Sequence, residues 1–185
     1  FLLCGGFPVY GITKSFLLIG QGYIGVVPIP VLIMIATFIA GYIFLNRLPF
    51  GRSVYGIGGN IEAARLSGIN VKRVLYKVYI LAGALYALAG LMLMARVNSG
   101  QAASGEGYEM DVITGCVLGG ISISGGEGKI TGVVTGVLLM GTLSNGMVLM
   151  DVSEYWQKVV KGLVLILAVT LDKTVQKGKT RKAEL

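Results

Sequence analysis

The chain has 185 residues, of which 54% are hydrophobic and 14% are charged, and its formal net charge is +7. A soluble domain carries about 25% charged residues, so this composition predicts a membrane protein. The sequence contains no histidine, which excludes Ser-His-Asp catalysis and His-ligated metal centres. Cys4 and Cys116 lie far apart in the sequence without metal-ligand spacing, so we interpret both as small apolar packing residues and predict no metal site.

The chain begins at Phe1, without Met and without a basic segment ahead of an apolar run. This start shows no signal peptide, and we expect the chain to be the later part of a longer protein.

Five apolar segments are predicted to enter the membrane. A helix needs about 20 residues to cross a hydrocarbon core of ~30 Å. Three segments reach this length: Ile24–Leu45, Val74–Ala95 and Ile130–Met150. The segment Tyr155–Leu171 is shorter and has a Tyr-Trp pair at its entry. The segment Val112–Ile123 is only 12 residues long. We predict that Val112–Ile123 is a short crossing. The alternatives are an upstream extension through Tyr108 to Asp111 and a half-membrane helix.

The distribution of charge predicts the orientation of these segments. Residues 46–73 hold five basic residues against one acidic, and residues 172–185 hold five against two, which gives +4 and +3. Both are cytoplasmic by the positive-inside rule, and the four segments between them satisfy the even number of crossings this requires. Residues 1–23, 96–108 and 151–154 then face outside, and the turn Ser124–Lys129 faces inside. The basic tail at 172–185 is interpreted as a topology signal rather than as a nucleic-acid site.

Two glycine-rich stretches resemble nucleotide-binding motifs but lack the required residues. The stretch at 125–129 has Ile123 where a Walker A loop needs glycine and Ile130 where it needs Ser or Thr. The stretch at 56–59 has Ile61 at the third glycine position of the dinucleotide fingerprint. We therefore predict no cofactor and no nucleotide site on this chain.

Other glycines recur every four residues along predicted helices, at 128, 132 and 136 and at 115 and 119. Such stripes let transmembrane helices pack closely. Packing within one subunit and dimerisation both explain them, and we favour packing within one subunit.

The most informative polar element is a short loop helix at residues 60–68. Asn60 is a good N-cap, Glu62 lies in the first turn where the helix dipole favours an acid, and Gly68 is placed to end the helix. The small side chains of Ala63 and Ala64 offer a flat face to a partner, while Glu62 and Arg65 can orient it. An amphipathic helix lying on the membrane is the alternative.

The sequence around this helix resembles the cytoplasmic coupling loop of bacterial sugar ABC-importer permeases of the ribose, xylose, arabinose and galactose type. These belong to the superfamily of branched-chain amino acid and monosaccharide permeases. The resemblance continues in order over nearly the whole chain and rests on the residues at 51–52, 58–60, 62–71, 99–101, 105–111, 118–122, 125–129 and 145–146. The chain looks like the C-terminal half of such a protein.

The resemblance implies an all-α, polytopic transmembrane helix bundle with the type II, or cobalamin-importer-like, importer fold and about five spans in this fragment. Residues 1–185 would form a permease domain, with 46–73 as the coupling loop and 172–185 as a cytoplasmic tail. It further implies a multi-pass protein of the bacterial inner membrane that is not itself an enzyme. Its partners would be a cytosolic ATP-binding cassette subunit, an external sugar-binding protein and a second permease subunit, as a homodimer in the expected case. The coupling residues would be Asn60, Glu62, Ala63, Ala64, Arg65 and Gly68.

Polar residues near the outer side are candidates for the sugar path. Tyr108, Glu109 and Asp111 precede the short apolar segment, and carboxylates and aromatic rings commonly contact sugars. Asp111 can instead cap a helix that starts at Val112, which is the reading we favour. The amide of Asn145 lies inside an apolar segment, where it more often bonds to a neighbouring helix than to a substrate.

The competing function is half of a secondary transporter driven by an ion gradient. That class places ionisable residues or broken helices at the middle of the bilayer. The three long apolar segments contain no carboxylate at mid-span, which favours the ATP-driven importer.

Overall fold

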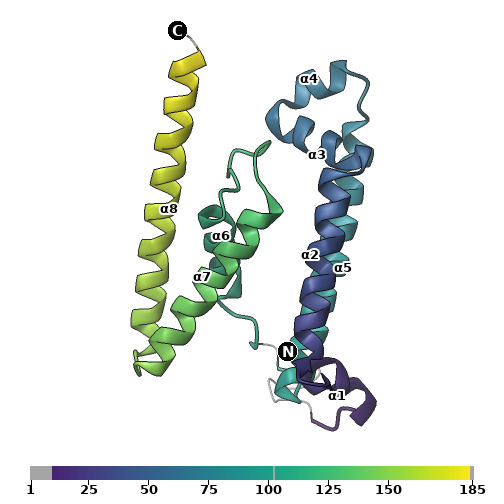
Figure 1. Cartoon of the computed structure of the whole chain (residues 1–185), viewed down its shortest axis with the longest axis vertical. Coiled ribbons are helices and arrows are strands. Elements are labelled where there is room, and N and C mark those ends of the chain that lie inside the picture. Colours follow the sequence, from purple (N-terminus) through teal and green to yellow (C-terminus); the bar gives the residue numbers. More distant parts are fainter. Residues whose placement is uncertain (1–9, 102, 184–185) are drawn as a thin grey trace. The chain divides into compact units, whose positions relative to one another are not determined.

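The structure, a computed structural model, describes residues 10–101 and 103–183, and it is mostly helical (Figure 1). Its contacts divide the chain into two compact units. One unit contains residues up to 53 together with 67–106, and the other contains residues 54–66 together with those from 107 onward. Cys4 lies outside the described residues, and Cys116 is a half-buried free cysteine.

The first unit opens with a short helix and a hairpin that lead into an apolar helix. Its elements are α1 (Lys14–Gln21), β1 (Tyr23–Ile24), β2 (Val27–Pro28), α2 (Ile29–Asn46), the start of α3 (Pro49–Gly59), and α5 (Val71–Val97). The antiparallel hairpin pairs Tyr23 with Pro28 and turns at Gly25, whose φ is +65°. The predicted helix start at Ile24 is therefore wrong, because the hairpin occupies that segment and α2 begins only after Pro28.

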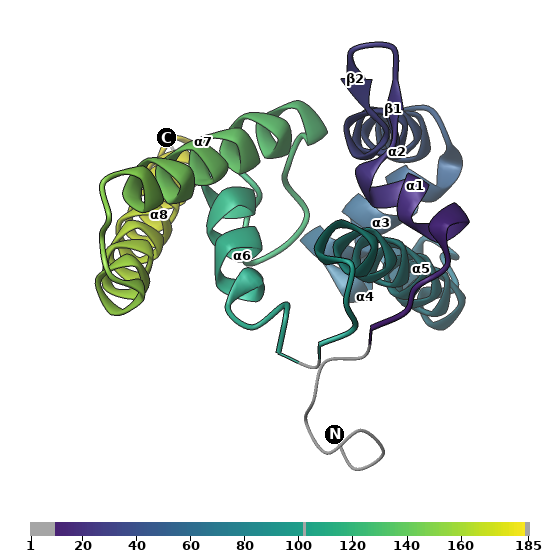
Figure 2. The same cartoon turned by 90° about the horizontal axis from the view of Figure 1, so that it is seen from below.

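Helix α1 lies between α2 and α5 (Figure 2). Gly20 is buried, and a Cβ there would lie 2.5 Å from the backbone nitrogen of Arg96, so only glycine permits this approach. Gln21 Nε2 also donates a hydrogen bond to the Arg96 carbonyl at 3.1 Å. These contacts fix α1 against the C-terminal end of α5.

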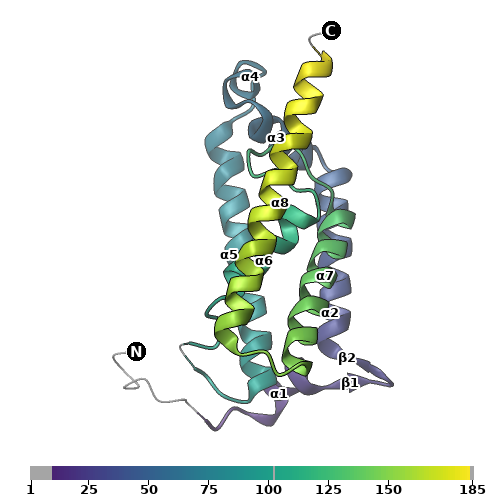
Figure 3. The same ribbon diagram turned by 90° about the vertical axis from the view of Figure 1, so that its left-hand side faces the viewer.

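The second unit contains the end of α3 with α4 (Ile61–Leu66), α6 (Tyr108–Leu118), α7 (Ile130–Leu149) and α8 (Glu154–Ala183). Helix α6 packs beside both α7 and α8 (Figure 3). Thr114 on α6 is fully buried, and Met140 and Met147 on α7 are nearly so. Helix α6 is therefore the central element of this unit.

Within the described residues, three helices are long and apolar enough to cross a membrane: α2, α5 and α7. They confirm three of the predicted spans. No residue of α2 is buried, as expected of a helix that is apolar all round and faces lipid or further helices. The predicted span Tyr155–Leu171 lies inside α8, which is not one of the three because Lys158, Lys161 and Asp172 lower its apolar character.

The short segment differs most from its prediction. Helix α6 runs from Tyr108 to Leu118 rather than from 112 to 123. Its 11 residues extend about 16 Å at a rise of ~1.5 Å each, roughly half of a hydrocarbon core. Helix α6 alone therefore has the length of the half-membrane alternative, and residues 119–129 continue as a non-helical segment up to α7.

Candidate functional site

The short helix α4 has the local structure that its sequence predicts. The Asn60 side chain accepts a hydrogen bond from the Ala63 backbone N–H at 3.0 Å, which confirms Asn60 as the N-cap. Its carbonyl accepts from the Ala64 N–H at 3.0 Å. Gly68, two residues beyond the helix, has φ +81°, a conformation that glycine adopts without strain. Glu62 lies in the first turn and Arg65 in the last, each favourable to the helix dipole.

The two alanines of α4 do not share one exposed face. Ala63 is exposed, but Ala64 is only 5% exposed and packs into the chain. The prediction that both alanines face a partner is therefore wrong for Ala64, since adjacent residues on a helix point about 100° apart. The side chains that α4 does present include Leu66, 88% exposed, and Ile61, 55% exposed. Sequence reasoning passed over both, although an apolar residue at each end of a polar loop helix was a usable signal.

The segment before α4 touches the glycine-rich turn that precedes α7. The Tyr55 hydroxyl donates a hydrogen bond to the Gly128 carbonyl at 3.0 Å. Gly58 and Gly59 lie directly against Gly125 and Gly126, backbone to backbone. The structure thus brings together two motifs that are about 65 residues apart in the sequence and that sequence analysis treated separately.

A hollow of about 600 Å³ lies beside this contact. It is lined by Tyr55 and by the backbone and side chains at 119–120, 126–129 and 131–132. The described residues contain no group of three or more Cys, Asp or Glu side chains placed to hold a metal ion.

The glycine stripes serve contacts between α6 and α7. A Cβ at Gly119 would lie 2.5 Å from the Gly132 carbonyl oxygen, and one at Gly136 would overlap the Gly115 carbonyl oxygen. The pairing of 115 with 136 and of 119 with 132 makes the two helices antiparallel. Packing within one subunit, the favoured interpretation, is confirmed at these four glycines.

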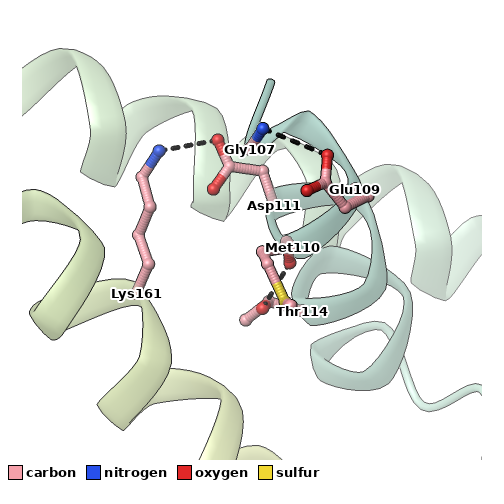
Figure 4. Close-up of polar contacts among 6 residues, drawn as sticks. All are labelled: Gly107, Glu109, Met110, Asp111, Thr114 and Lys161. Atoms are coloured by element: carbon pink, nitrogen blue, oxygen red, sulfur yellow. Dashed lines mark hydrogen bonds and ion pairs between the residues drawn. The ribbon is translucent and has the colours of Figure 1, made fainter. Parts of the chain in front are cut away.

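Asp111, one of the two candidate acids of the outer side, does not have the capping role that was favoured for it (Figure 4). Asp111 does not cap α6, because the helix already begins at Tyr108 and Asp111 lies one turn inside it. Its Oδ2 forms an ion pair with Lys161 Nζ of α8 at 2.7 Å, and the two side chains are 24% and 19% exposed. The other oxygen, Oδ1, is buried without a hydrogen-bond partner among the described residues. Glu109 is the acid at the helix start, where it accepts a hydrogen bond from the Gly107 N–H at 3.1 Å.

The remaining two candidates of the sugar path are exposed. Tyr108 is 56% exposed at the first position of α6, next to Glu109. Asn145 is exposed on α7. Among the described residues, its amide forms no hydrogen bond with Tyr108, Glu109 or Asp111. The structure therefore groups Tyr108, Glu109 and Asp111 on one helical turn and leaves Asn145 outside that group.

Lys161 is a residue that sequence analysis missed. It lies seven residues into α8, beyond the aromatic pair Tyr155 and Trp156, and thus about 10 Å along the helix. A lysine at such depth in an apolar segment is expensive unless it is paired, so its presence was a signal that an acid lies opposite. Asp111 is that acid.

Three helices that are long and apolar enough to cross a membrane, together with the half-length helix α6 and the capped helix α4, indicate a membrane protein. Comparison with known proteins gives the family. Residues 5–169 match the model of the permease component of branched-chain amino acid transport systems, and the chain belongs to this family.

Curated relatives cover most of the chain. It is 47% identical over 170 residues to the ribose import permease protein RbsC of Bacillus subtilis (strain 168), covering 91% of this chain and 53% of that protein. It is 45% identical over 151 residues to the xylose transport system permease protein XylH of Escherichia coli (strain K12), covering 82% and 38%. The L-arabinose transport system permease protein AraH of the same organism is 43% identical over 166 residues, covering 90% and 51%.

The chain thus spans about half the length, or less, of these curated relatives. No solved structure matches it significantly.

Proposed function

We propose that this chain forms part of the membrane permease of an ATP-driven monosaccharide importer in the bacterial inner membrane. The observation that carries the proposal is α4, a capped helix in a basic loop whose exposed side chains include two large apolar residues. Three relatives with 43–47% identity bear the names of ribose, xylose and arabinose permease proteins, which supports a sugar as the substrate. The fold we propose is the type II importer fold.

Helix α4 and its flanks are the proposed docking site for a cytosolic ATP-binding cassette subunit. Leu66 and Ile61 are the apolar anchors, exposed Ala63 allows close approach, and Glu62 and Arg65 lie at the rim. Asn60 and Gly68 hold the helix ends, and Ala64 holds α4 to its own chain. The other partners would be an external sugar-binding protein and a second permease subunit, in a homodimer.

The contact between residues 55–59 and 125–128 supports the proposed topology. Because the first segment lies in the basic loop assigned to the cytoplasm, the turn Ser124–Lys129 lies on the same side. Helix α7 then leads outward, and α6 reaches about half of the membrane with its first turn at mid-depth. Irregular backbone at that depth is tolerated where protein or a water-filled path surrounds it. This makes Tyr108 and Glu109 the better candidates for the sugar path.

The secondary-transporter alternative would use an ionisable residue inside the membrane. Asp111 and Lys161 are such residues, but they neutralise each other at 2.7 Å. A closed ion pair between two helices favours a structural role over cyclic uptake of an ion. The ATP-driven importer therefore remains the proposal.

A single apolar truncation tests the docking site. Leu66→Ser removes a side chain whose burial in a partner is worth about 2 kcal/mol, or roughly 30-fold in affinity. Leu149→Ser, at an 80% exposed leucine at the end of α7, is the matched control. The permease is co-expressed with a candidate ATP-binding cassette subunit from the same organism. Copurification and uptake of labelled ribose, xylose and arabinose are measured. Equal copurification of both variants with the ATPase subunit would remove the proposed docking role.

A further inference from the structure

Three glycines from two distant segments, Gly58, Gly125 and Gly126, make a close backbone contact in which an added Cβ would collide with the opposite segment. A Cβ on Gly58 would lie 2.5 Å from the Gly126 nitrogen, and a Cβ on Gly126 would lie 2.7 Å from the Gly59 nitrogen and Cα. A Cβ on Gly125 would lie 2.9 Å from the Gly58 carbonyl oxygen. Gly125 and Gly126 also have φ values of +88° and +77°, which favour glycine. We call these three glycines, 58, 125 and 126, the glycine clasp.

The glycine clasp is fixed by neighbours on the α3 side. Tyr55, one turn before Gly58, reaches across to the Gly128 carbonyl at 3.0 Å. Ile57 is 7% exposed and therefore anchors the same turn in the chain's interior. The hollow lined by Tyr55 and by residues 119–120, 126–129 and 131–132 lies beside the clasp. Displacement of the end of α3 therefore acts on the turn through a few backbone atoms.

The clasp joins the segment that precedes helix α4 to the turn that precedes helix α7. Gly59 directly precedes Asn60, the N-cap of α4. Gly126 lies four residues before Ile130, the first residue of α7. Helices α6 and α7 interlock through Gly115, Gly119, Gly132 and Gly136, so they move as one hairpin.

We propose that the glycine clasp transmits displacement of α4 to the α6–α7 hairpin, and that Gly58 and Gly126 are positioning residues for transport. This inference rests on the proposed function, because it takes α4 as the docking helix. It adds the route by which motion reaches the membrane: from α4 to the end of α3, across the clasp to the turn 124–129, and into the hairpin that carries Tyr108 and Glu109. Rigid packed elements joined by such contacts are the physical carriers of coupling.

Two neighbouring alanine substitutions test the clasp. Gly58→Ala introduces a methyl group that collides with Gly126, whereas a Cβ at Gly59 has no atom within 4 Å. Neither glycine has a positive φ, so the two variants carry the same local helix preference and differ only in the collision. We expect Gly58→Ala to lower the number of sugar molecules transported per ATP hydrolysed by roughly tenfold, inside the 5–150-fold range of typical coupling energies. Gly59→Ala should retain the wild-type ratio.

The measurements separate this inference from the proposed docking role. Uptake and ATP hydrolysis are measured in proteoliposomes containing the permease with its ATPase subunit and binding protein, alongside copurification of the ATPase subunit. An unchanged transport-to-hydrolysis ratio in Gly58→Ala overturns the clasp, and so does loss of the ATPase subunit, because it would show that Gly58 serves docking. Failure of the wild-type permease to bind an ATPase subunit overturns the proposed function itself.

A milder variant covers the case in which Gly58→Ala does not insert into the membrane. Tyr55→Phe removes only the hydrogen bond to Gly128 and keeps the ring. It should lower the same ratio about fivefold, at the lower end of typical coupling energies. A ratio equal to wild type in Tyr55→Phe would then reject the clasp.

Discussion

The ion pair between Asp111 and Lys161 makes a quantitative prediction about stability and transport. Two unit charges 2.7 Å apart attract by about 6 kcal/mol at an effective dielectric constant of ~20. Removing water from each ion costs several kcal/mol, so the net contribution of the pair is close to zero. Removing only one partner does lower the stability, because the other charge then remains unpaired in a site that is about one fifth exposed. We expect each single change to cost about 2 kcal/mol, between the values for exposed and buried pairs.

The variants are Asp111→Asn, Lys161→Met and the double substitution. Each single variant should lower the midpoint of thermal unfolding in detergent and the amount of protein in the membrane. The double variant should recover most of both, because no unpaired charge remains; if it costs about 1 kcal/mol, the coupling energy is about 3 kcal/mol. Arg96, on the other unit, offers a control charge: Arg96→Gln should change neither quantity by more than the ±0.5 kcal/mol typical of surface substitutions.

Uptake of labelled sugar per molecule of inserted protein decides what the pair is for. If it only holds α6 to α8, the double variant should transport like the wild type. The reasoning is refuted by additive stability losses, which would mean that the two side chains do not interact. Recovery of stability without recovery of uptake would instead give Asp111 a direct role in the sugar path.

Two further predictions concern the cytoplasmic side. The Ala63→Trp variant should insert normally but abolish ATP-dependent uptake. The Ala64→Trp variant should instead lower the amount of permease in the membrane, because overpacking a residue that is 5% exposed costs about 1–3 kcal/mol. Similar membrane abundance of the two variants would contradict the assignment of faces on α4. The third test places a single cysteine at the exposed position 127, with Cys4 and Cys116 replaced by serine. This cysteine should resist membrane-impermeant maleimide in intact cells and react after permeabilisation. Labelling in intact cells would place the turn Ser124–Lys129 outside and reject the even number of crossings.

The sequence was sufficient to predict the long spans and α4 because their signals are local. Apolar runs of about 20 residues identify α2, α5 and α7, and side-chain capping at Asn60 acts within three residues. The start of α2 was missed because the whole apolar run from Ile24 was taken as one span, whereas Gly25 turns the chain into a hairpin first. For α6 the favoured start at Val112 with Asp111 as its cap was wrong, and the alternative start at Tyr108 is correct: Glu109, rather than Asp111, accepts a backbone hydrogen bond near the N-terminus.

The ion pair and the clasp depend on contacts between distant segments, which periodicity does not specify. Lys161 and Asp111 are 50 residues apart, and only the packing of α8 on α6 brings them together. Ala64 and Ala63 look alike in the sequence, and their difference in exposure arises from what the rest of the chain places against one of them. Such pairings need the tertiary structure.

The glycines of this chain are visible in the sequence, but the contacts they make are defined only by the tertiary structure. Its 29 glycines indicate close packing without naming the partners. The structure divides several of them into two groups: Gly115, Gly119, Gly132 and Gly136 join α6 to α7, and the clasp joins that hairpin to the segment before α4. Both groups replace side-chain interdigitation by backbone contact, which tolerates no added atom. A chain of such contacts leads without interruption from the proposed docking helix to the half-length helix that carries Tyr108 and Glu109, and a single methyl group at Gly58 is enough to test it.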